Sequence, residues 1–205
     1  MIIAGAGGHG LEVAMALDKL GFPSEQVFFY DQDKSKISDP EIGKSLVLKD
    51  DDLKNILKND SRFVIGVGNP VFREKLFKQL SSLGGSLFGI SFVSEKVLNI
   101  TSNTFDAMPY SFIGPRTKIG LGVLVNTRAH VHHECEVGDF SEIGPGAMLL
   151  GASKIGRKCR IGAGAVILPG VELGNEVVVG AGAVVTKSYL KPCTLIGIPA
   201  IIHKK

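Results

Sequence analysis

The sequence has 205 residues, a formal net charge of +3 at neutral pH and 44% hydrophobic residues. This length allows one or two domains, and the apolar content is ample for a core. The small, dispersed charge gives no reason to expect nucleic-acid binding. Three cysteines indicate neither a disulfide framework nor a CxxC zinc site. Because neither a secretion signal nor an apolar run of transmembrane length is found, we expect a cytoplasmic protein without membrane insertion.

The first ten residues, MIIAGAGGHG, place a short apolar run before glycines at the G-x-G-x-x-G spacing. Helical periodicity over residues 11–20 follows, and then an apolar strand over residues 27–30 that ends at Asp31. Strand, glycine-rich turn, helix, strand and acid form the first unit of a Rossmann-like fold. In such a unit an anion binds at the helix N-terminus and the acid can bind a sugar hydroxyl. The alternative is a tight turn in a domain that only packs.

The rest of the N-terminal region continues the alternation of strands and helices. The apolar runs predict strands over residues 46–48, 63–67 and 86–93, and helices that begin at Asp50 and Val71. The three aspartates of residues 50–52 favour a solvated first helical turn over a metal site. Gly68 and Asn69 follow a strand at the edge where ligands bind in open α/β sheets. We therefore predict a Rossmann-like domain over residues 1–93.

From residue 113 to residue 185 an aliphatic side chain recurs at every sixth position without interruption. The residue four positions further on is small in every copy, and glycine often follows the aliphatic residue. A period of six fits neither an amphipathic helix nor a half-buried strand. It fits a chain that turns a corner every six residues, so that three sides make one coil and stacked coils bury one another. Cys135 and Cys159 fall on the small inward position and are expected to be core residues.

The edges of this repeat are less regular. Residues 94–112 fit the period badly and are expected to form a linker and an imperfect first coil. The repeat domain is therefore predicted over residues 94–188, with a tail over residues 189–205.

Three of the five histidines lie together, at His130, His132 and His133. His133 is two residues past an inward aliphatic residue and so lies at a corner, facing solvent or a neighbouring subunit. A histidine is the natural general base at neutral pH, and the carboxylate of Glu134 on one ring nitrogen would raise the basicity of the other. A structural role stays open. A metal site is disfavoured, because no histidine occurs between His133 and His203 to supply ligands from a second coil.

The whole chain resembles the bacterial sugar O- and N-acyltransferases of the pilin-glycosylation and sialic-acid O-acetyltransferase type. The motifs that carry the resemblance are the loop of residues 5–10, Asp31, residues 66–69, Asn126-Thr127 and His133-Glu134-Cys135 followed by Val137-Gly138. The resemblance implies an α/β Rossmann-like domain followed by an all-β left-handed parallel β-helix. It also implies acetyl-CoA as co-substrate, no metal, and a homotrimer with the active site at the subunit interface.

The resemblance further implies roles for single residues. The catalytic group would be His133 as base, Glu134 raising its basicity, Asn126 orienting the site and Gly151 offering its N–H to the oxyanion. The nucleotide sugar would be bound by Gly7, Gly8, His9, Asp31, Gln32 and Gly68. The coenzyme would contact Glu142, Gly151, Ala163 and Ala181, with the tail packed nearby. Two departures stand out: Glu142 replaces a histidine that often meets acetyl-CoA, and Gln32 replaces a second acid that often follows Asp31.

The expected reaction is direct acetyl transfer from acetyl-CoA to the amino group of a nucleotide-linked amino sugar, in bacterial glycan biosynthesis. O-acetylation of a sialic acid or another sugar hydroxyl stays open, because both reactions need one base and one oxyanion hole. A nucleotide-sugar-binding module with weak catalysis is a further alternative, which Glu142 favours.

Overall fold

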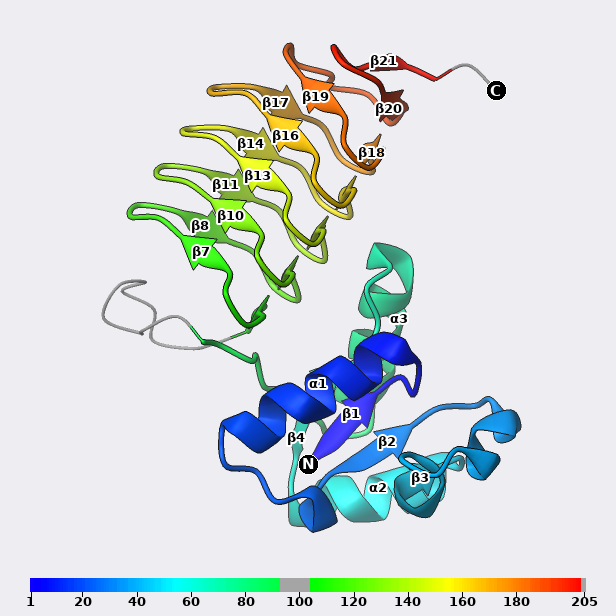
Figure 1. Cartoon of the computed structure of the whole chain (residues 1–205). Helices are drawn as coiled ribbons and strands as arrows, with labels where there is room; N and C mark the ends of the chain where they lie inside the picture. The colour runs from blue at the N-terminus through cyan, green and yellow to red at the C-terminus, as the bar shows by residue number, and fades with distance from the viewer. Residues whose placement is uncertain (93–103, 204–205) are drawn as a thin grey trace. The chain divides into compact units, whose positions relative to one another are not determined.

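The computed structural model describes residues 1–92 and 104–203, so the predicted boundary at residue 93 lies outside the described residues. Two compact units divide the chain: residues 1–68 and 72–88 form one, and residues 69–71 and those from 89 onward form the other (Figure 1). No helix in the described ranges combines the length and the apolarity needed to cross a membrane.

The N-terminal unit is built on a parallel sheet of five strands in the order β3-β2-β1-β4-β5. The strands are β1 (Ile2–Ala4), β2 (Phe28–Tyr30), β3 (Leu46–Val47), β4 (Arg62–Ile65) and β5 (Ser86–Leu87). The helices are α1 (Gly8–Lys19), α2 (Asp50–Asn59) and α3 (Pro70–Ser82), with short 3₁₀ helices at Ser24–Gln26, Lys34–Ser38 and Gly43–Ser45. Leucines of α2 and α3 pack with Ile2 and Phe63 in one core cluster, so these two helices share one face of the sheet.

The strand order reverses between β1 and β4, because the chain first winds outward to β3 and then returns to the other side of β1. In open α/β sheets the crevice at the carboxyl ends of such a pair is where ligands bind. Helix α1 begins at Gly8 rather than at residue 11, so His9 lies in its first turn and not in the loop. Gly10 permits this early start, because a Cβ there would overlap the Gly5 carbonyl oxygen.

The second unit stacks short strands into three sheets around one core (Figure 1). Sheet I contains β6 (Asp106–Ala107), β9 (Leu124–Val125), β12 (Glu142–Ile143), β15 (Arg160–Ile161), β18 (Val178–Val179), β20 (Thr194–Ile196) and β21 (Ile201–Ile202). Sheet II contains β7 (Phe112–Ile113), β10 (His130–Val131), β13 (Met148–Leu149), β16 (Val166–Ile167) and β19 (Val184–Val185). Sheet III contains β8 (Lys118–Ile119), β11 (Glu136–Val137), β14 (Lys154–Ile155) and β17 (Glu172–Leu173).

The predicted coil of three six-residue sides sets the register. Val131 pairs with Leu149 and Val137 with Ile155, in each case eighteen residues further along the chain. The coil extends past residue 188 at its end, because β20 pairs in parallel with β18 before β21 turns back on it.

Cys135 and Cys159 are buried in the core, and burial raises the pKa of the Cys159 thiol to about 11. A thiol enclosed in the core cannot reach a thioester, so neither cysteine is placed to form an acyl-enzyme.

The outward side chains make sheets II and III very different surfaces. On sheet III, Lys118 pairs with Glu136 and Lys154 with Glu172, both at 3.0 Å, forming a charged ladder typical of a solvated face. The outward positions of sheet II are Phe112, His130, Met148, Val166 and Val184, which are apolar or aromatic and only half-buried to exposed within one chain. Sheet II is therefore the face of the β-helix that gains most from being covered.

Candidate active site

The corner between sheets II and III carries His133 and Glu134. The turn is fixed from both sides, since Glu134 N donates to Pro115 O at 3.0 Å and Ala152 N donates to His133 O at 2.9 Å. Glu134 has a φ of 61°, the left-handed conformation that lets the chain change direction here. The side chain of His133 is 60% exposed, so it projects from the corner toward solvent. The prediction that His133 lies at a corner is confirmed.

A short chain of polar contacts orients the imidazole. His133 Nδ1 lies 3.0 Å from Glu134 Oε2, and Arg116 Nη1 donates to Glu134 Oε1 at 3.1 Å. The hydrogen bond with His133, and next the one with Arg116, hold the pKa of the Glu134 carboxyl below its usual range. An ionised carboxylate can only accept, so Nδ1 carries the proton and Nε2 presents its lone pair. Nε2 forms no hydrogen bond with any residue in the described ranges, and it can therefore accept a proton from a ligand.

Replacing Glu134 by glutamine is expected to lower kcat about 10- to 100-fold, because the amide neither stabilises the imidazolium nor fixes the tautomer. The lowered pKa keeps Glu134 ionised until the pH falls below the ordinary carboxyl range, so its pairing is present throughout neutral pH and lost only in acid. The acidic limb of the kcat/KM profile should move to lower pH in the variant. Glu136→Gln, which removes a carboxylate paired with Lys118 on sheet III, is the matched control and should leave the profile unchanged.

Gly151 lies one coil further along the same corner, directly against the histidine ring. A Cβ at Gly151 would stand 2.5 Å from His133 Cε1 and 2.6 Å from Nε2, closer than real Cβ atoms approach. Within the described ranges the Gly151 N–H donates no hydrogen bond. The structure thus brings a free backbone donor next to a free ring nitrogen, which is the pairing that acyl transfer needs.

Two of the predicted coenzyme residues, Ala163 and Ala181, lie with the predicted catalytic residue Asn126 on a different corner, between sheets I and II. Asn126 is nearly buried there, and its Oδ1 accepts from Thr127 N at 2.7 Å. Ala163 and Ala181 stand at the same corner, two and three coils beyond Asn126, and are exposed. Their N–H groups donate to no other described residue. One side of the coil separates these residues from His133 in a single chain.

Glu142 stands on β12 with its side chain only 9% exposed, and Arg160 Nε donates to its Oε2 at 2.9 Å. This arginine, like Arg116 beside Glu134, was missed in the sequence. Both lie eighteen residues from the acid they pair with, so the coil length was the signal that could have found them.

At the N-terminal domain the glycine-rich turn is held by Asp31, whose Oδ2 accepts from Ala6 N at 2.9 Å. Gly7 and Gly8 lead into α1, and His9 Nδ1 lies 2.9 Å from Glu12 Oε2 in its first turn. The buried His9 Nε2 has no partner among the described residues. Asp31 therefore shapes the glycine-rich turn directly.

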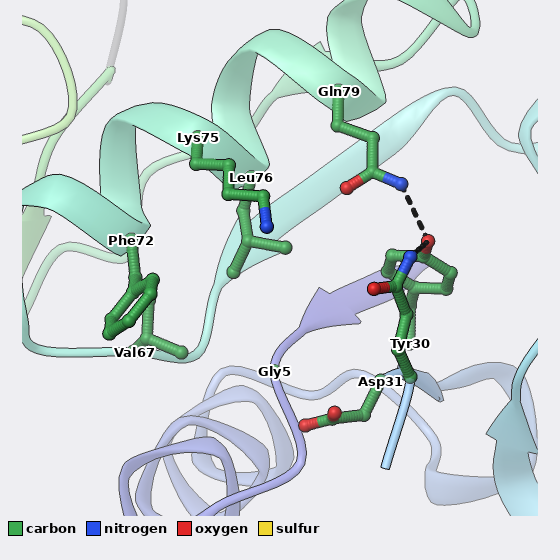
Figure 2. A pocket seen from close by; sticks show the side chains of 9 residues that line it. Gly5, Tyr30, Asp31, Val67, Phe72, Lys75, Leu76 and Gln79 are labelled. Atoms are coloured by element: carbon green, nitrogen blue, oxygen red, sulfur yellow. Dashed lines mark hydrogen bonds between the residues drawn. The ribbon is translucent and has the colours of Figure 1, made fainter.

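A cavity of about 160 Å³ opens beside this turn (Figure 2). It is lined by Gly5, Tyr30, Asp31, Gln32, Val67, Phe72, Lys75, Leu76 and Gln79. Asp31 and Gln32 were predicted to bind substrate and do line it, whereas Gly68 only follows the lining residue Val67. The sequence analysis did not identify Tyr30 or the residues of α3 as part of the cavity. They come together only when α3 packs on the sheet, and no local sequence pattern marks such contacts.

Two sequence families match parts of the chain: the PglD N-terminal domain over residues 1–80, and the bacterial transferase hexapeptide (six repeats) over residues 152–187. Among solved structures, the chain is similar to GDP-perosamine N-acetyl transferase from Caulobacter crescentus, a variant with one histidine replaced by alanine, in complex with CoA and GDP-perosamine. That match has 27% identity, a TM-score of 0.82 and coverage of 100% of this chain and 96% of that one.

The acetyltransferase domain of PglB from Neisseria gonorrhoeae FA1090, in complex with acetyl coenzyme A, is 28% identical with a TM-score of 0.77, covering 98% of each chain. WeeI from Acinetobacter baumannii AYE is 25% identical with a TM-score of 0.73, covering 99% of this chain and 100% of that one. The matches define a transferase of the hexapeptide-repeat class. Within that class, the two family matches and the similarity along the whole chain to sugar acetyltransferases support a bacterial sugar acyltransferase. The predicted fold, a Rossmann-like domain followed by a left-handed parallel β-helix, is confirmed.

Proposed function

We propose that the chain transfers the acetyl group of acetyl-CoA directly to the amino group of a nucleotide-linked amino sugar, in bacterial glycan biosynthesis. The observation that carries the proposal is the free Nε2 of His133 beside the free N–H of Gly151. Similarity along the whole chain to an N-acetyl transferase held with CoA and GDP-perosamine supports the choice of both substrates. We place this activity in the cytoplasm.

The proposed reaction uses the groups gathered at this corner. Nε2 of His133 takes a proton from the amine as the amine nitrogen bonds to the thioester carbon, and the Gly151 N–H stabilises the oxyanion that forms. The C–S bond then breaks, and the departing sulfur takes the proton from the imidazolium. Glu134, kept ionised by its hydrogen bonds with His133 and Arg116, stabilises that imidazolium. General base catalysis contributes about 10²- to 10⁴-fold and one oxyanion donor about 10²- to 10³-fold.

The active site is proposed to be completed by a second copy of the chain within a homotrimer. Asn126, Ala163 and Ala181 would come from the corner between sheets I and II of the neighbouring copy, with Glu142 beside them facing the coenzyme. The unbonded N–H groups of the two alanines suit the amide carbonyls of the coenzyme's pantetheine arm. Both corners flank sheet II, so an assembly that covers its apolar face can bring them together.

A charge placed on sheet II is therefore expected to dissociate the oligomer. Val166→Glu puts a carboxylate in the middle of the apolar face, and burying it unpaired is costly enough to favour the monomer. Sedimentation velocity should show a smaller species with little activity. Lys154→Glu, at a comparable coil on sheet III, is the matched control, and dissociation by this change rather than by Val166→Glu would contradict the assignment.

In the N-terminal domain, Gly7, Gly8, His9, Asp31, Gln32 and Gly68 are proposed to hold the nucleotide sugar. The diphosphate would sit at the start of α1, where free backbone N–H groups and the helix dipole favour an anion. Asp31, already bonded to Ala6 N, keeps lone pairs that can accept from a sugar hydroxyl.

Release of the coenzyme A thiol tests the proposal. Purified protein is mixed with acetyl-CoA and either a nucleotide-linked amino sugar or the same nucleotide sugar with a hydroxyl in place of the amine. We expect thiol release with the amine only. Release with the hydroxyl instead would favour O-acetylation. Binding of the nucleotide sugar without acetyl-CoA binding, measured by calorimetry, would favour a module that only binds.

A further inference from the structure

The cavity of the N-terminal unit lies at the carboxyl ends of β1, β2 and β4, where the strand order reverses. Its volume is about 160 Å³. Sites that enclose a whole drug-sized ligand measure about 300–1,000 Å³. A nucleotide sugar is larger still, so the cavity takes one ring of it, with the rest running along the glycine-rich turn.

One wall of the cavity suits a flat aromatic ring. Val67, Phe72 and Leu76 supply apolar surface, and the Phe72 ring remains 55% exposed at the rim (Figure 2). Bases stack on aromatic side chains in this way, whereas a hydroxyl-rich sugar finds few partners on such a wall. Lys75 on the same rim also disfavours the cationic amino sugar, because it would repel a protonated amine. The base is therefore the part of the ligand that this cavity fits.

A hydrogen-bond chain behind the opposite wall fixes the direction of an amide. Tyr30 OH donates to Asp50 Oδ1 at 2.7 Å, because an ionised carboxylate can only accept. The tyrosine oxygen is then left as an acceptor, and Gln79 Nε2 donates to it at 2.6 Å. Burial, and next the bond to Asp50, raises the pKa of Tyr30, so the phenol keeps its proton.

This order leaves the Gln79 carbonyl oxygen facing the cavity. Figure 2 shows it turned away from Tyr30, toward Lys75 and Leu76, and no residue in the described ranges donates to it. The Gln32 amide also donates to Tyr30 OH through Nε2, at the longer distance of 3.5 Å. Besides the Asp31 carboxylate, the cavity lining thus contains the amides of Gln79 and of the exposed Gln32, whose oxygens can accept, and the Lys75 ammonium as a donor.

From this pattern we infer that the cavity selects guanine, so that the acceptor substrate of the proposed acetyl transfer is a GDP-linked amino sugar. The inference rests on the proposed function and names the nucleotide that it uses. Guanine presents two neighbouring donors, the ring N–H and the 2-amino group, beside one carbonyl acceptor. Two acceptors and one ammonium match that edge. Uracil presents one donor between two acceptors and would leave one of the amide carbonyls without a partner on the base.

Calorimetry with three free nucleotides tests the inference on the wild-type protein. IDP is guanosine diphosphate without the 2-amino group, and UDP carries the smaller base. We expect GDP to bind about tenfold tighter than IDP, since one lost hydrogen bond leaves an acceptor unpaired, and tighter than UDP by at least as much. Equal or tighter binding of IDP or UDP overturns the inference.

A variant locates the effect. Gln79→Met keeps the length of the side chain and removes the carbonyl, so the preference for GDP over IDP should fall to about twofold while UDP binding changes little. Lys78→Met, on the same helix and paired with Glu74 outside the cavity, is the matched control and should keep the full preference. A preference that survives in Gln79→Met contradicts the assignment of Gln79.

The two hypotheses fail in different ways. If the protein binds UDP best and still releases coenzyme A with a UDP-linked amino sugar, the base assignment is wrong and the acetyl transfer stands. If GDP binds with the expected preference but no amino sugar nucleotide supports thiol release, the cavity is assigned correctly and the proposed reaction is wrong.

Discussion

Replacing His133 by asparagine is expected to lower kcat about 10²- to 10⁴-fold while leaving the fold intact. The side chain is 60% exposed and packs in no core, so its loss removes the proton acceptor at little cost in stability. Asparagine can still donate to Glu134 and so keeps the local contact that the ring makes through Nδ1. Steady-state thiol release and thermal unfolding, measured on the same preparations, check the two halves of the expectation.

His203→Asn is the matched control, because His203 is also exposed but lies at the far end of the β-helix, after β21. It should retain near-normal kcat. If His133→Asn also retained near-normal turnover with a normal melting temperature, the assignment of His133 as base would be wrong.

The second large loss of catalytic rate is expected on replacing Gly151 by alanine, because the new side chain would displace the histidine ring. In Gly151→Ala the new Cβ would stand 2.6 Å from His133 Nε2, so the ring must move. An exposed ring moves cheaply, and the melting temperature should change little. A displacement of about 1 Å at the reacting group nevertheless costs on the order of 100-fold in rate. Because alanine keeps its backbone N–H, the loss would report the position of the base rather than the oxyanion donor.

Gly114 supplies the contrasting substitution at the same histidine. A Cβ there would lie 2.7 Å from the backbone nitrogen of His133. This backbone is held in the neighbouring coil and cannot move away as an exposed side chain can. Gly114→Ala should therefore lower the free energy of unfolding by about 1–3 kcal/mol. Loss of stability in Gly151→Ala with unchanged turnover would contradict the close packing of Gly151 on the ring.

Much of the β-helix could be predicted because its information is local. One aliphatic and one small residue every six positions specify the three sheets, the inward cysteines and the corner that carries His133. The same period specifies which residues stack, and it would have paired Arg116 with Glu134 and Arg160 with Glu142. Those contacts join side chains eighteen residues apart, which a search for short motifs does not compare.

The N-terminal cavity could be predicted only in part. Asp31 and Gln32 follow a strand whose pattern is plain, so their place at the carboxyl edge of the sheet could be predicted. Tyr30, Asp50 and Gln79 meet through the packing of α2 and α3 on the same sheet face, and Tyr30 and Gln79 are 49 residues apart. The start of α1 was placed too late, since glycines disfavour a helix in general, whereas Gly10 is required here by the close Gly5 carbonyl.

The central claim is direct transfer from acetyl-CoA to an amine with His133 as the base, and a single-turnover experiment tests it most directly. The protein is mixed with acetyl-CoA, first alone and then with the amino sugar nucleotide, while thiol release and the intact protein mass are followed. We expect no thiol and no acetylated protein until the amine is added, then release of one coenzyme A per acetylated sugar, slowed about 10²-fold or more in His133→Asn. Acetylated protein that forms before the amine is added, or an unchanged rate in the variant, would contradict the account.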